Sequence, residues 1–216
     1  MSALAYDLLH DSSQIEDADD DAILVPFDGQ DQVCGWVGTR ACVVPKPVLF
    51  EANFQVTQQS DFPCNDVDWP IMSSRMIEIL RTVGDFPHRL VPVRLIDRSV
   101  QGPARYLSDG RLRLEAVDDR FAAVQLIEHL DVVDWERSVF ERDQIGPSIV
   151  LYSFDKLILL EPPGGLPPLF RVPAQKGLLL VSADARRALE EAGIRGITFM
   201  SIPGAGATDS PLQSGA

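Results

Sequence analysis

The sequence has few of the residues that build disulfide frameworks, metal sites and membrane spans. Of its 216 residues, three are cysteine and three are histidine. An odd number of cysteines without any CxxC spacing supports neither a disulfide framework nor a zinc ribbon. No apolar run approaches the ~20 residues of a transmembrane helix, and the N-terminus lacks the basic and apolar regions of a secretory signal. We therefore expect a cytoplasmic protein that makes no membrane contact.

Lysine and arginine are absent from the first 39 positions, which carry nine acids; Arg40 is the first of either. The remaining 177 residues carry 23 acids and 19 bases, so most of the formal net charge of −13 is N-terminal. An acidic surface repels phosphate backbones and attracts basic proteins. Nucleic-acid binding is thus disfavoured. The acids from Glu16 to Asp21 either maintain solubility or attract a basic partner, and the run lacks the central glycine and closing glutamate of a calcium loop.

Motifs of catalysis are also missing. The three histidines are dispersed, and the sequence has no HExxH, GxSxG, GxxxxGK[ST] or GxGxxG. Cys42 has apolar flanks that suit a small buried side chain. We predict no catalytic residue, no cofactor and no metal. Two alternatives stay open: an assembly subunit, and a small hydrolase that uses a carboxylate pair. The candidate carboxylates for the hydrolase are Asp66, Asp68, Asp118, Asp119, Asp131 and Asp134.

What is present is an ordinary globular composition, with 45% hydrophobic and 24% charged residues. Turn-forming residues predict three hairpins: 23–37 around Asp28-Gly29, 104–117 around Ser108-Asp109-Gly110, and 149–161 around residues 153–156. Residues 57–70 are dense in turn formers and predict a loop. Residues 90–96 favour a strand, and Pro92 within them indicates a sheet edge or a bulge. Residues 121–135 fit neither a helix nor a strand well.

Two helices are predicted at 74–83 and 183–192, each after a serine that suits the N-cap and before a glycine that suits the C-terminus. Ser73 and Ser182 are 109 positions apart, as are Gly84 and Gly193. The segments 71–95 and 180–204 therefore share a strand-helix-strand layout. This layout reflects either an internal duplication or the serine and glycine that commonly begin and end the helix of any strand-helix-strand unit.

These patterns predict an α+β fold, mostly antiparallel sheet with two main packed helices. We assign residues 1–22 to an acidic N-terminal segment, 23–203 to a single domain, and 204–216 to a flexible tail.

The C-terminal half also resembles a known family. Leu169-Phe170-Arg171, a strand ending in Val181-Ser182, a helix, then Gly193-Ile194-Arg195-Gly196 and Phe199 follow one another in residues 166–203. This order is similar to the signature of the eleventh immunity-protein family of bacterial polymorphic toxins. Asp134 and Ser138 resemble its central Asp-x-x-x-Ser, and VDWPIMSSRMIEIL resembles its proline and serine-capped helix. The resemblance covers about residues 66–203 and implies that residues 121–135 begin as a strand.

The resemblance implies a protein that binds a cognate toxin and neutralises it by stoichiometric inhibition. A partner with a basic face suits the acidic charge. Two tryptophans directly follow an aspartate, in Asp68-Trp69 and Asp134-Trp135, and either present an aromatic ring beside a negative charge or fill the core. The candidate partner-binding residues are Asp17, Asp19, Asp20, Asp21, Asp68, Trp69, Asp134 and Trp135.

Overall fold

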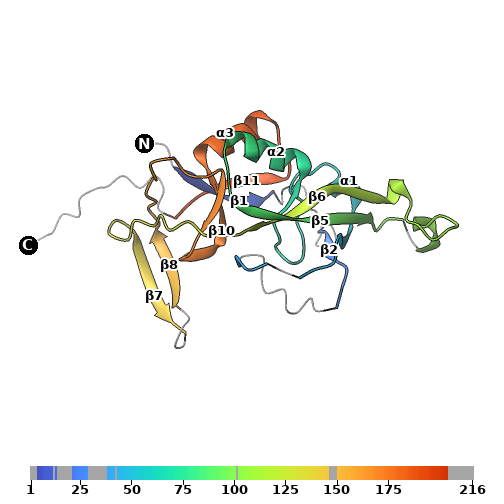
Figure 1. Ribbon diagram of the computed structural model, residues 1–216, viewed down its shortest axis with the longest axis horizontal. Helices are drawn as coiled ribbons and strands as arrows, with labels where there is room; N and C mark the ends of the chain where they lie inside the picture. Colours follow the sequence, from blue (N-terminus) through green and yellow to red (C-terminus); the bar gives the residue numbers. More distant parts are fainter. Residues whose placement is uncertain are drawn as a thin grey trace, which may run out of the picture.

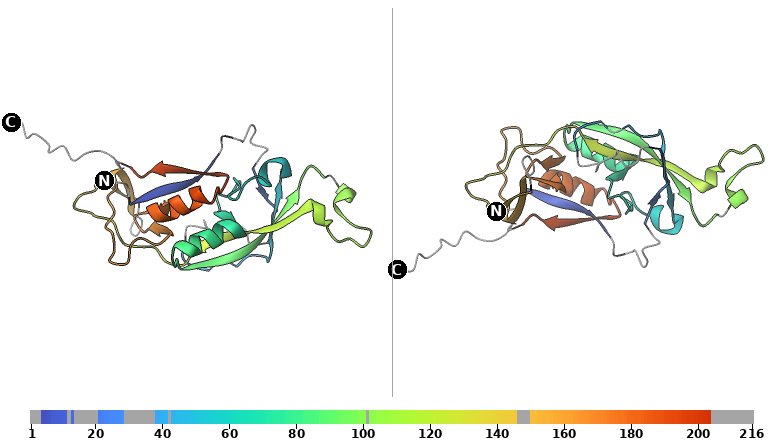
Figure 2. Two further views of the ribbon diagram at one scale, coloured as in Figure 1. Left: turned by 90° about the horizontal axis from the view of Figure 1, so that it is seen from above. Right: turned by 90° about the horizontal axis from the view of Figure 1, so that it is seen from below.

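The computed structural model describes residues 4–11, 13, 21–28, 38–41, 43–100, 102–145 and 150–203. Its strands form two main sheets and a separate hairpin, and its two longer helices lie side by side (Figures 1 and 2). The first sheet has the order β11-β1-β10-β9, formed by β1 (Ala5–His10), β9 (Leu169–Val172), β10 (Gln175–Ser182) and β11 (Ile197–Ser201). The second has the order β2-β3-β5-β6-β4, formed by β2 (Ile23–Leu24), β3 (Val48–Ala52), β4 (Ile71–Ser73), β5 (His88–Asp97) and β6 (Val117–Leu126).

The predicted α+β class is confirmed. All pairs of neighbouring named strands are antiparallel except β3 and β5, which are parallel. The helices are α1 (Phe54–Thr57), α2 (Ser74–Val83) and α3 (Ala183–Glu191), with short 3-10 turns η4 (Gly102–Arg105) and η5 (Leu114–Ala116). Within the described ranges, none of these helices has the length and apolar character needed to cross a bilayer.

The two strand-helix-strand segments take up the same arrangement. In each, the two strands flank a third, antiparallel strand: β6 lies between β4 and β5, and β1 lies between β10 and β11. Both predicted serine caps are confirmed, because Ser73 Oγ accepts from Met76 N at 3.1 Å and Ser182 Oγ accepts from Ala185 N at 3.2 Å. Gly193 has the left-handed φ of +62° expected after a helix, whereas Gly84 is extended, so the predicted left-handed closure is wrong there.

The first sheet corrects the predicted N-terminal boundary. Residues 5–10, which we assigned to an acidic segment outside the domain, form β1 and occupy an inner position of the sheet. Ala5 and Leu8 are buried, and Leu8 packs in the same core cluster as the buried faces of α2 and α3. The strand therefore belongs to the folded domain. The predicted tail at 204–216 lies outside the described residues.

The predicted hairpins need correction. Residues 153–156 do not turn; they lie inside β8 (Val150–Lys156), which pairs with β7 (Val139–Gln144). Ile23–Leu24 pairs with β3, and residues 29–37 of the predicted first hairpin lie outside the described residues. The turn at 108–110 is confirmed, since Gly110 has a φ of +82°. The predicted strands beside it are not, because a single bridge joins Tyr106 to Leu112 and the flanking residues form η4 and η5.

The strand, edge and loop predictions are largely confirmed. Residues 121–126 are strand, and most of residues 57–70 form a loop after α1. β5 has a neighbour on both sides, but β3 pairs only with Val93–Asp97. Pro92 lies just before that stretch, at the point where β5 is still a sheet edge on one side. A residue without an N–H is tolerated there because no strand needs its donor.

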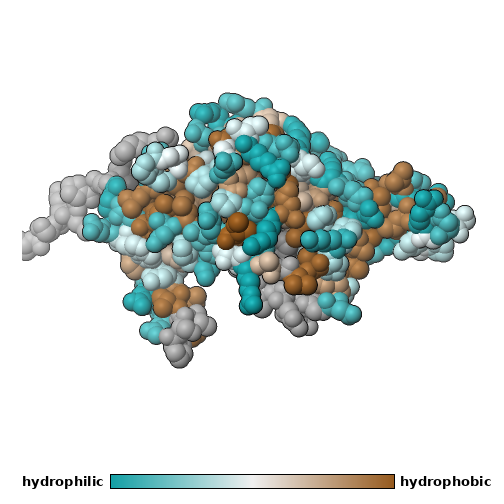
Figure 3. All heavy atoms as spheres, in the orientation of Figure 1, coloured by the Kyte–Doolittle hydropathy of each residue, from teal (hydrophilic) through white to brown (hydrophobic). Residues whose placement is uncertain are grey.

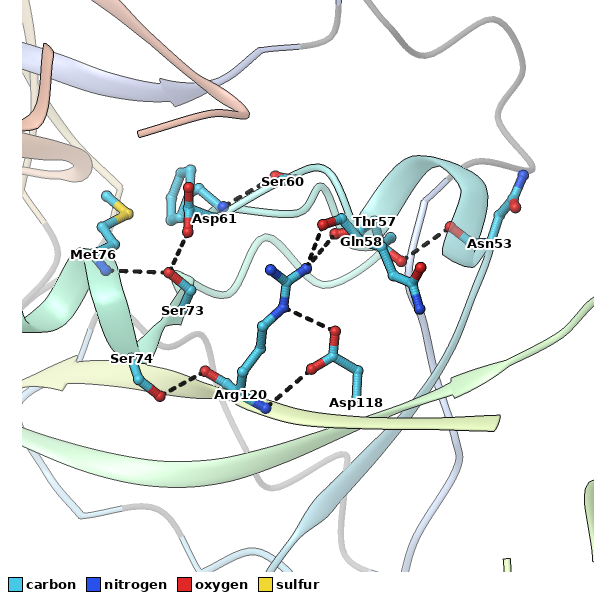
Figure 4. Close-up of polar contacts among 11 residues, drawn as sticks. Asn53, Thr57, Gln58, Ser60, Asp61, Ser73, Ser74, Met76, Asp118 and Arg120 are labelled. Atoms are coloured by element: carbon cyan, nitrogen blue, oxygen red, sulfur yellow. Dashed lines mark hydrogen bonds and ion pairs between the residues drawn. The ribbon is translucent and has the colours of Figure 1, made fainter. Parts of the chain in front are cut away.

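A buried aspartate connects the loop at 58–70 with both helical units. Asp61 Oδ1 accepts from the Ser73 hydroxyl at 2.6 Å, and Asp61 Oδ2 accepts from Arg195 N at 3.2 Å. Figure 4 shows the bond to Ser73 beside a second group, in which Arg120 donates to Asp118 and to the carbonyls of Thr57 and Gln58. The Ser74 hydroxyl also donates to the Arg120 carbonyl at 2.9 Å. The bonds of Arg120 therefore hold the C-terminal end of α1 and the start of α2 against β6.

Candidate partner-binding surface

The structure separates the predicted partner-binding residues into three groups. Asp17, Asp19 and Asp20 lie outside the described residues. Asp21 and Asp68 lie close together on one side of the molecule. Asp134 and Trp135 lie at the base of the β7–β8 hairpin, and Trp69 lies in the core.

Asp21 and Asp68 are brought together by the pairing of their neighbours. Ala22 N donates to the Cys64 carbonyl at 2.9 Å, and Leu24 N donates to Asp66 Oδ1 at 2.9 Å. Burial, together with the negative charges of Asp21 and Asp68, raises the pKa of the Cys64 thiol to about 11. Residues 21–24 and 64–68 thus form a locally negative surface.

The prediction for Trp69 is wrong. Its side chain is 3% exposed and packs edge-on against Phe50, with the ring centroids 5.9 Å apart. The side-chain amide of Asn65 bonds to both the N–H and the carbonyl of Trp69, at 2.9 and 2.8 Å. A tryptophan held in this way supports the second sheet and is not available to a partner.

Asp134 builds the turn that presents Trp135. The Asp134 carbonyl accepts from Ser138 N at 2.9 Å, and Asp134 Oδ1 accepts from Arg137 N at 3.1 Å. Asp134 N donates to the Ile158 carbonyl at 2.9 Å, and Ser138 Oγ accepts from Ile158 N at 3.0 Å. The Asp-x-x-x-Ser pattern is therefore a closed turn bonded to the segment that follows β8.

The β7–β8 hairpin projects from the body of the molecule (Figure 1) and carries an aromatic cluster on one face. Trp135 lies against Phe140 and Tyr152, with ring centroids 5.1 and 5.0 Å apart, and Phe154 lies 5.7 Å from Phe140. Such separations are typical of favourable aromatic pairs. An isolated two-stranded hairpin is marginally stable in water, so these rings stabilise it. Trp135 nevertheless remains 40% exposed.

The opposite face of the hairpin is acidic. Paired residues on antiparallel strands share a face, so Glu141 lies beside Ser153, and Asp143 lies beside Leu151. These four residues are exposed, and Leu151 is 50% exposed although it is apolar. Figure 3 shows adjoining apolar and polar patches on the hairpin. The hairpin therefore offers aromatic anchors and negative charge within a few residues of one another.

Sequence reasoning identified Trp135 but missed the residues that surround it. Phe140, Tyr152 and Phe154 form the cluster with it. The signal was available, because the apolar residues Val150, Tyr152 and Phe154 recur at every second position, as in a strand with one apolar face. We instead placed a turn at 153–156.

Two buried or clustered acidic features bear on the metal and hydrolase alternatives. In the described ranges, no group of three His, Cys, Asp or Glu side chains is placed to hold a metal ion. Burial raises the pKa of Asp7 to about 6, but this side chain lies within the first sheet and its charged neighbour is Arg171. That arrangement does not provide the second carboxylate that the hydrolase alternative requires.

Comparisons with known proteins leave the family open. No protein-family model matches the chain, and no curated protein matches it. The likeness to the immunity family consequently rests on the motifs described above.

Proposed function

We propose that this protein is a bacterial immunity protein that binds a cognate toxin in the cytoplasm and neutralises it by stoichiometric inhibition. The observation that carries the proposal is the projecting β7–β8 hairpin with the exposed ring of Trp135 at its base. Tryptophan and tyrosine anchors on rigid elements dominate the energetics of protein interfaces. The motif likeness supports the same function, because its Asp-x-x-x-Ser is the turn that presents Trp135.

The expected partner has a basic surface. The exposed Glu141 and Asp143 lie on the hairpin, Asp21 and Asp68 lie on a second negative surface, and the chain has a net charge of −13. Complementary charge of this kind raises the association rate and favours correct partners more than it raises final affinity.

The proposal is tested with the product of a neighbouring gene that is toxic when expressed alone. Co-expression with this protein should restore growth, and the two chains should co-purify in a fixed stoichiometry. If no neighbouring product is toxic and no partner co-purifies, the immunity function is rejected.

Replacing Trp135 with alanine should weaken toxin binding by roughly 30-fold, the effect of losing one interface hot spot of ~2 kcal/mol. Isothermal titration calorimetry with the purified toxin measures this change. Tyr106→Ala is the matched control, because Tyr106 is 46% exposed and lies far from the hairpin, on the turn-containing arm between β5 and β6. Equal affinities for Trp135→Ala and wild type would remove the hairpin from the interface.

Changing Asp17, Asp19, Asp20 and Asp21 to asparagine should slow toxin association several-fold at low salt, with little change in the dissociation rate. Stopped-flow measurements over a range of salt concentrations detect this effect. The control neutralises four exposed acids elsewhere to their amides: Asp85, Glu128, Glu161 and Glu191. An association rate at low salt that stays at the wild-type value would exclude steering by the N-terminal acids.

A further inference from the structure

Three consecutive charged side chains of the β7–β8 hairpin are sorted by sign onto its two faces. The register places Arg142 opposite Tyr152, which belongs to the aromatic cluster, so Arg142 lies on the aromatic face. Glu141 and Asp143 flank Arg142 in the sequence, and successive residues of a strand point to opposite faces. The acidic face therefore carries two carboxylates, and the aromatic face carries a guanidinium.

These charges find no partner within the described part of the chain. Elsewhere in the protein, exposed arginines pair with nearby carboxylates, as Arg94 does with Asp119 at 2.6 Å. Among the described residues, no hydrogen bond or ion pair involves the side chains of Glu141, Arg142 and Asp143. The two carboxylates lie about 6.6 Å apart along one face, where like charges repel. A basic surface that covers this face would relieve the repulsion.

Both faces of the hairpin are accessible beyond its base. Figure 1 shows the two strands projecting from the body of the molecule. Phe154, near the base, packs against a core cluster of the first sheet. Further along the strands, Glu141, Arg142 and Asp143 are exposed, and Leu151 on the acidic face is 50% exposed. A partner can therefore contact the hairpin from two sides.

We propose that the toxin binds the hairpin between two surfaces of opposite charge: a basic surface against Glu141 and Asp143, and an apolar surface with a carboxylate against Arg142. This inference rests on the proposed immunity function and extends it, because a uniformly basic partner would repel Arg142. Tyr152 lies opposite Arg142 and 5.0 Å from the ring of Trp135, so aromatic contact area adjoins the guanidinium. Arginine, tryptophan and tyrosine are the residues enriched at interface hot spots. Arg142 is thus the residue that discriminates the cognate toxin from other basic proteins.

Arg142→Glu separates this specific pairing from the effect of overall charge. The chain carries a net charge of −13, and the substitution makes it more acidic, so association with a basic toxin should become faster. The dissociation rate should nevertheless rise by roughly ten-fold or more, because breaking a desolvated charge pair acts on dissociation. Surface plasmon resonance with the purified toxin measures both rates.

Arg111→Glu is the matched control, because Arg111 is exposed, lies on the arm between β5 and β6, and changes the net charge equally. It should leave the dissociation rate unchanged. Arg142→Lys keeps the charge and should dissociate more slowly than Arg142→Glu. Glu141→Lys with Asp143→Lys should slow association and speed dissociation. The fluorescence of Trp135, compared between variants and wild type, shows whether the hairpin stays folded.

The outcomes distinguish this inference from the proposed function. If Arg142→Glu dissociates at the wild-type rate, the two-sided contact is overturned, and neutralisation of the toxin by that variant leaves the immunity function standing. If the wild type neither binds nor neutralises a toxic neighbouring product, both are rejected. Sedimentation velocity of the protein alone tests a second copy as the occupant. A wild-type dimer that Arg142→Glu dissociates would place that copy on the hairpin and overturn the proposal.

Discussion

Replacing Asp61 with alanine is expected to lower the free energy of unfolding by about 3 kcal/mol, because a buried carboxylate that joins separate segments is lost. Asp61 is 4% exposed and accepts hydrogen bonds from the Ser73 hydroxyl and from Arg195 N. Arg75 adds an ion pair at 3.6 Å. Alanine leaves the Arg195 N–H without its acceptor and frees the hydroxyl that caps α2. Urea unfolding followed by circular dichroism measures the difference.

Two further variants show whether the carboxylate itself is responsible. Asp61→Asn keeps the shape and one acceptor oxygen, so we expect it to lose about half as much stability. Asp85→Ala removes an exposed carboxylate and should change the free energy of unfolding by less than about 0.5 kcal/mol. If Asp61→Ala unfolds within about 1 kcal/mol of wild type, the polar junction does not hold the two helical units together.

The features that sequence reasoning predicted correctly are local. Each serine cap bonds to an N–H three residues ahead, so Ser73 and Ser182 identify the start of a helix without knowledge of the rest of the fold. The junction at Asp61 could not be predicted in this way. Its bond to Arg195 spans 134 residues, and only the fold brings the two together.

The prediction of strand pairing failed for the same reason, because pairing depends on residues that only the fold brings together. A tetrapeptide such as Ser153 to Lys156 is compatible with a turn, but the aromatic partners on β7 favour an extended strand. Phe140 pairs with Phe154, and Arg142 pairs with Tyr152. The contribution of these cross-strand pairs to stability can be judged only when the register of both strands is known.

The two Asp-Trp dipeptides show that the surrounding structure determines whether a tryptophan is buried or exposed. Asp68 has a positive φ of 52°, and Trp69 then turns into the core, where Asn65 holds its backbone. Asp134 instead closes a turn with Ser138, and Trp135 emerges beside the hairpin. Identical dipeptides therefore produced one core residue and one candidate anchor.

The second large effect that we expect is a dependence of folding stability on pH. It arises from Asp7, which is buried near Arg171 in the first sheet. Asp7 is 4% exposed, and its Oδ1 accepts from Leu179 N at 3.2 Å. Burial raises its pKa from 3.8 to about 6, although the Leu179 N–H and the charge of Arg171 both lower it. Arg171 is also buried and donates to the carbonyls of Lys176 and Gly177. The folded protein therefore binds a proton at Asp7 more tightly than the unfolded chain does.

This difference sets the sign of the pH dependence. The stability that the proton at Asp7 contributes is fully present below pH 3.8 and is lost as the pH rises through about 6. Asp7→Asn imitates the protonated side chain, so it should match wild type near pH 4 and exceed it by roughly 2 to 3 kcal/mol above pH 7, at ~1.4 kcal/mol per pKa unit. Urea unfolding of both proteins between these pH values measures the gap. In the control, Asp11→Asn should show a small change of opposite sign, because the hydrogen bonds of Ser13 lower the pKa of Asp11. A gap for Asp7→Asn that does not grow between pH 4 and pH 7 would show that Asp7 stays solvated in the folded sheet.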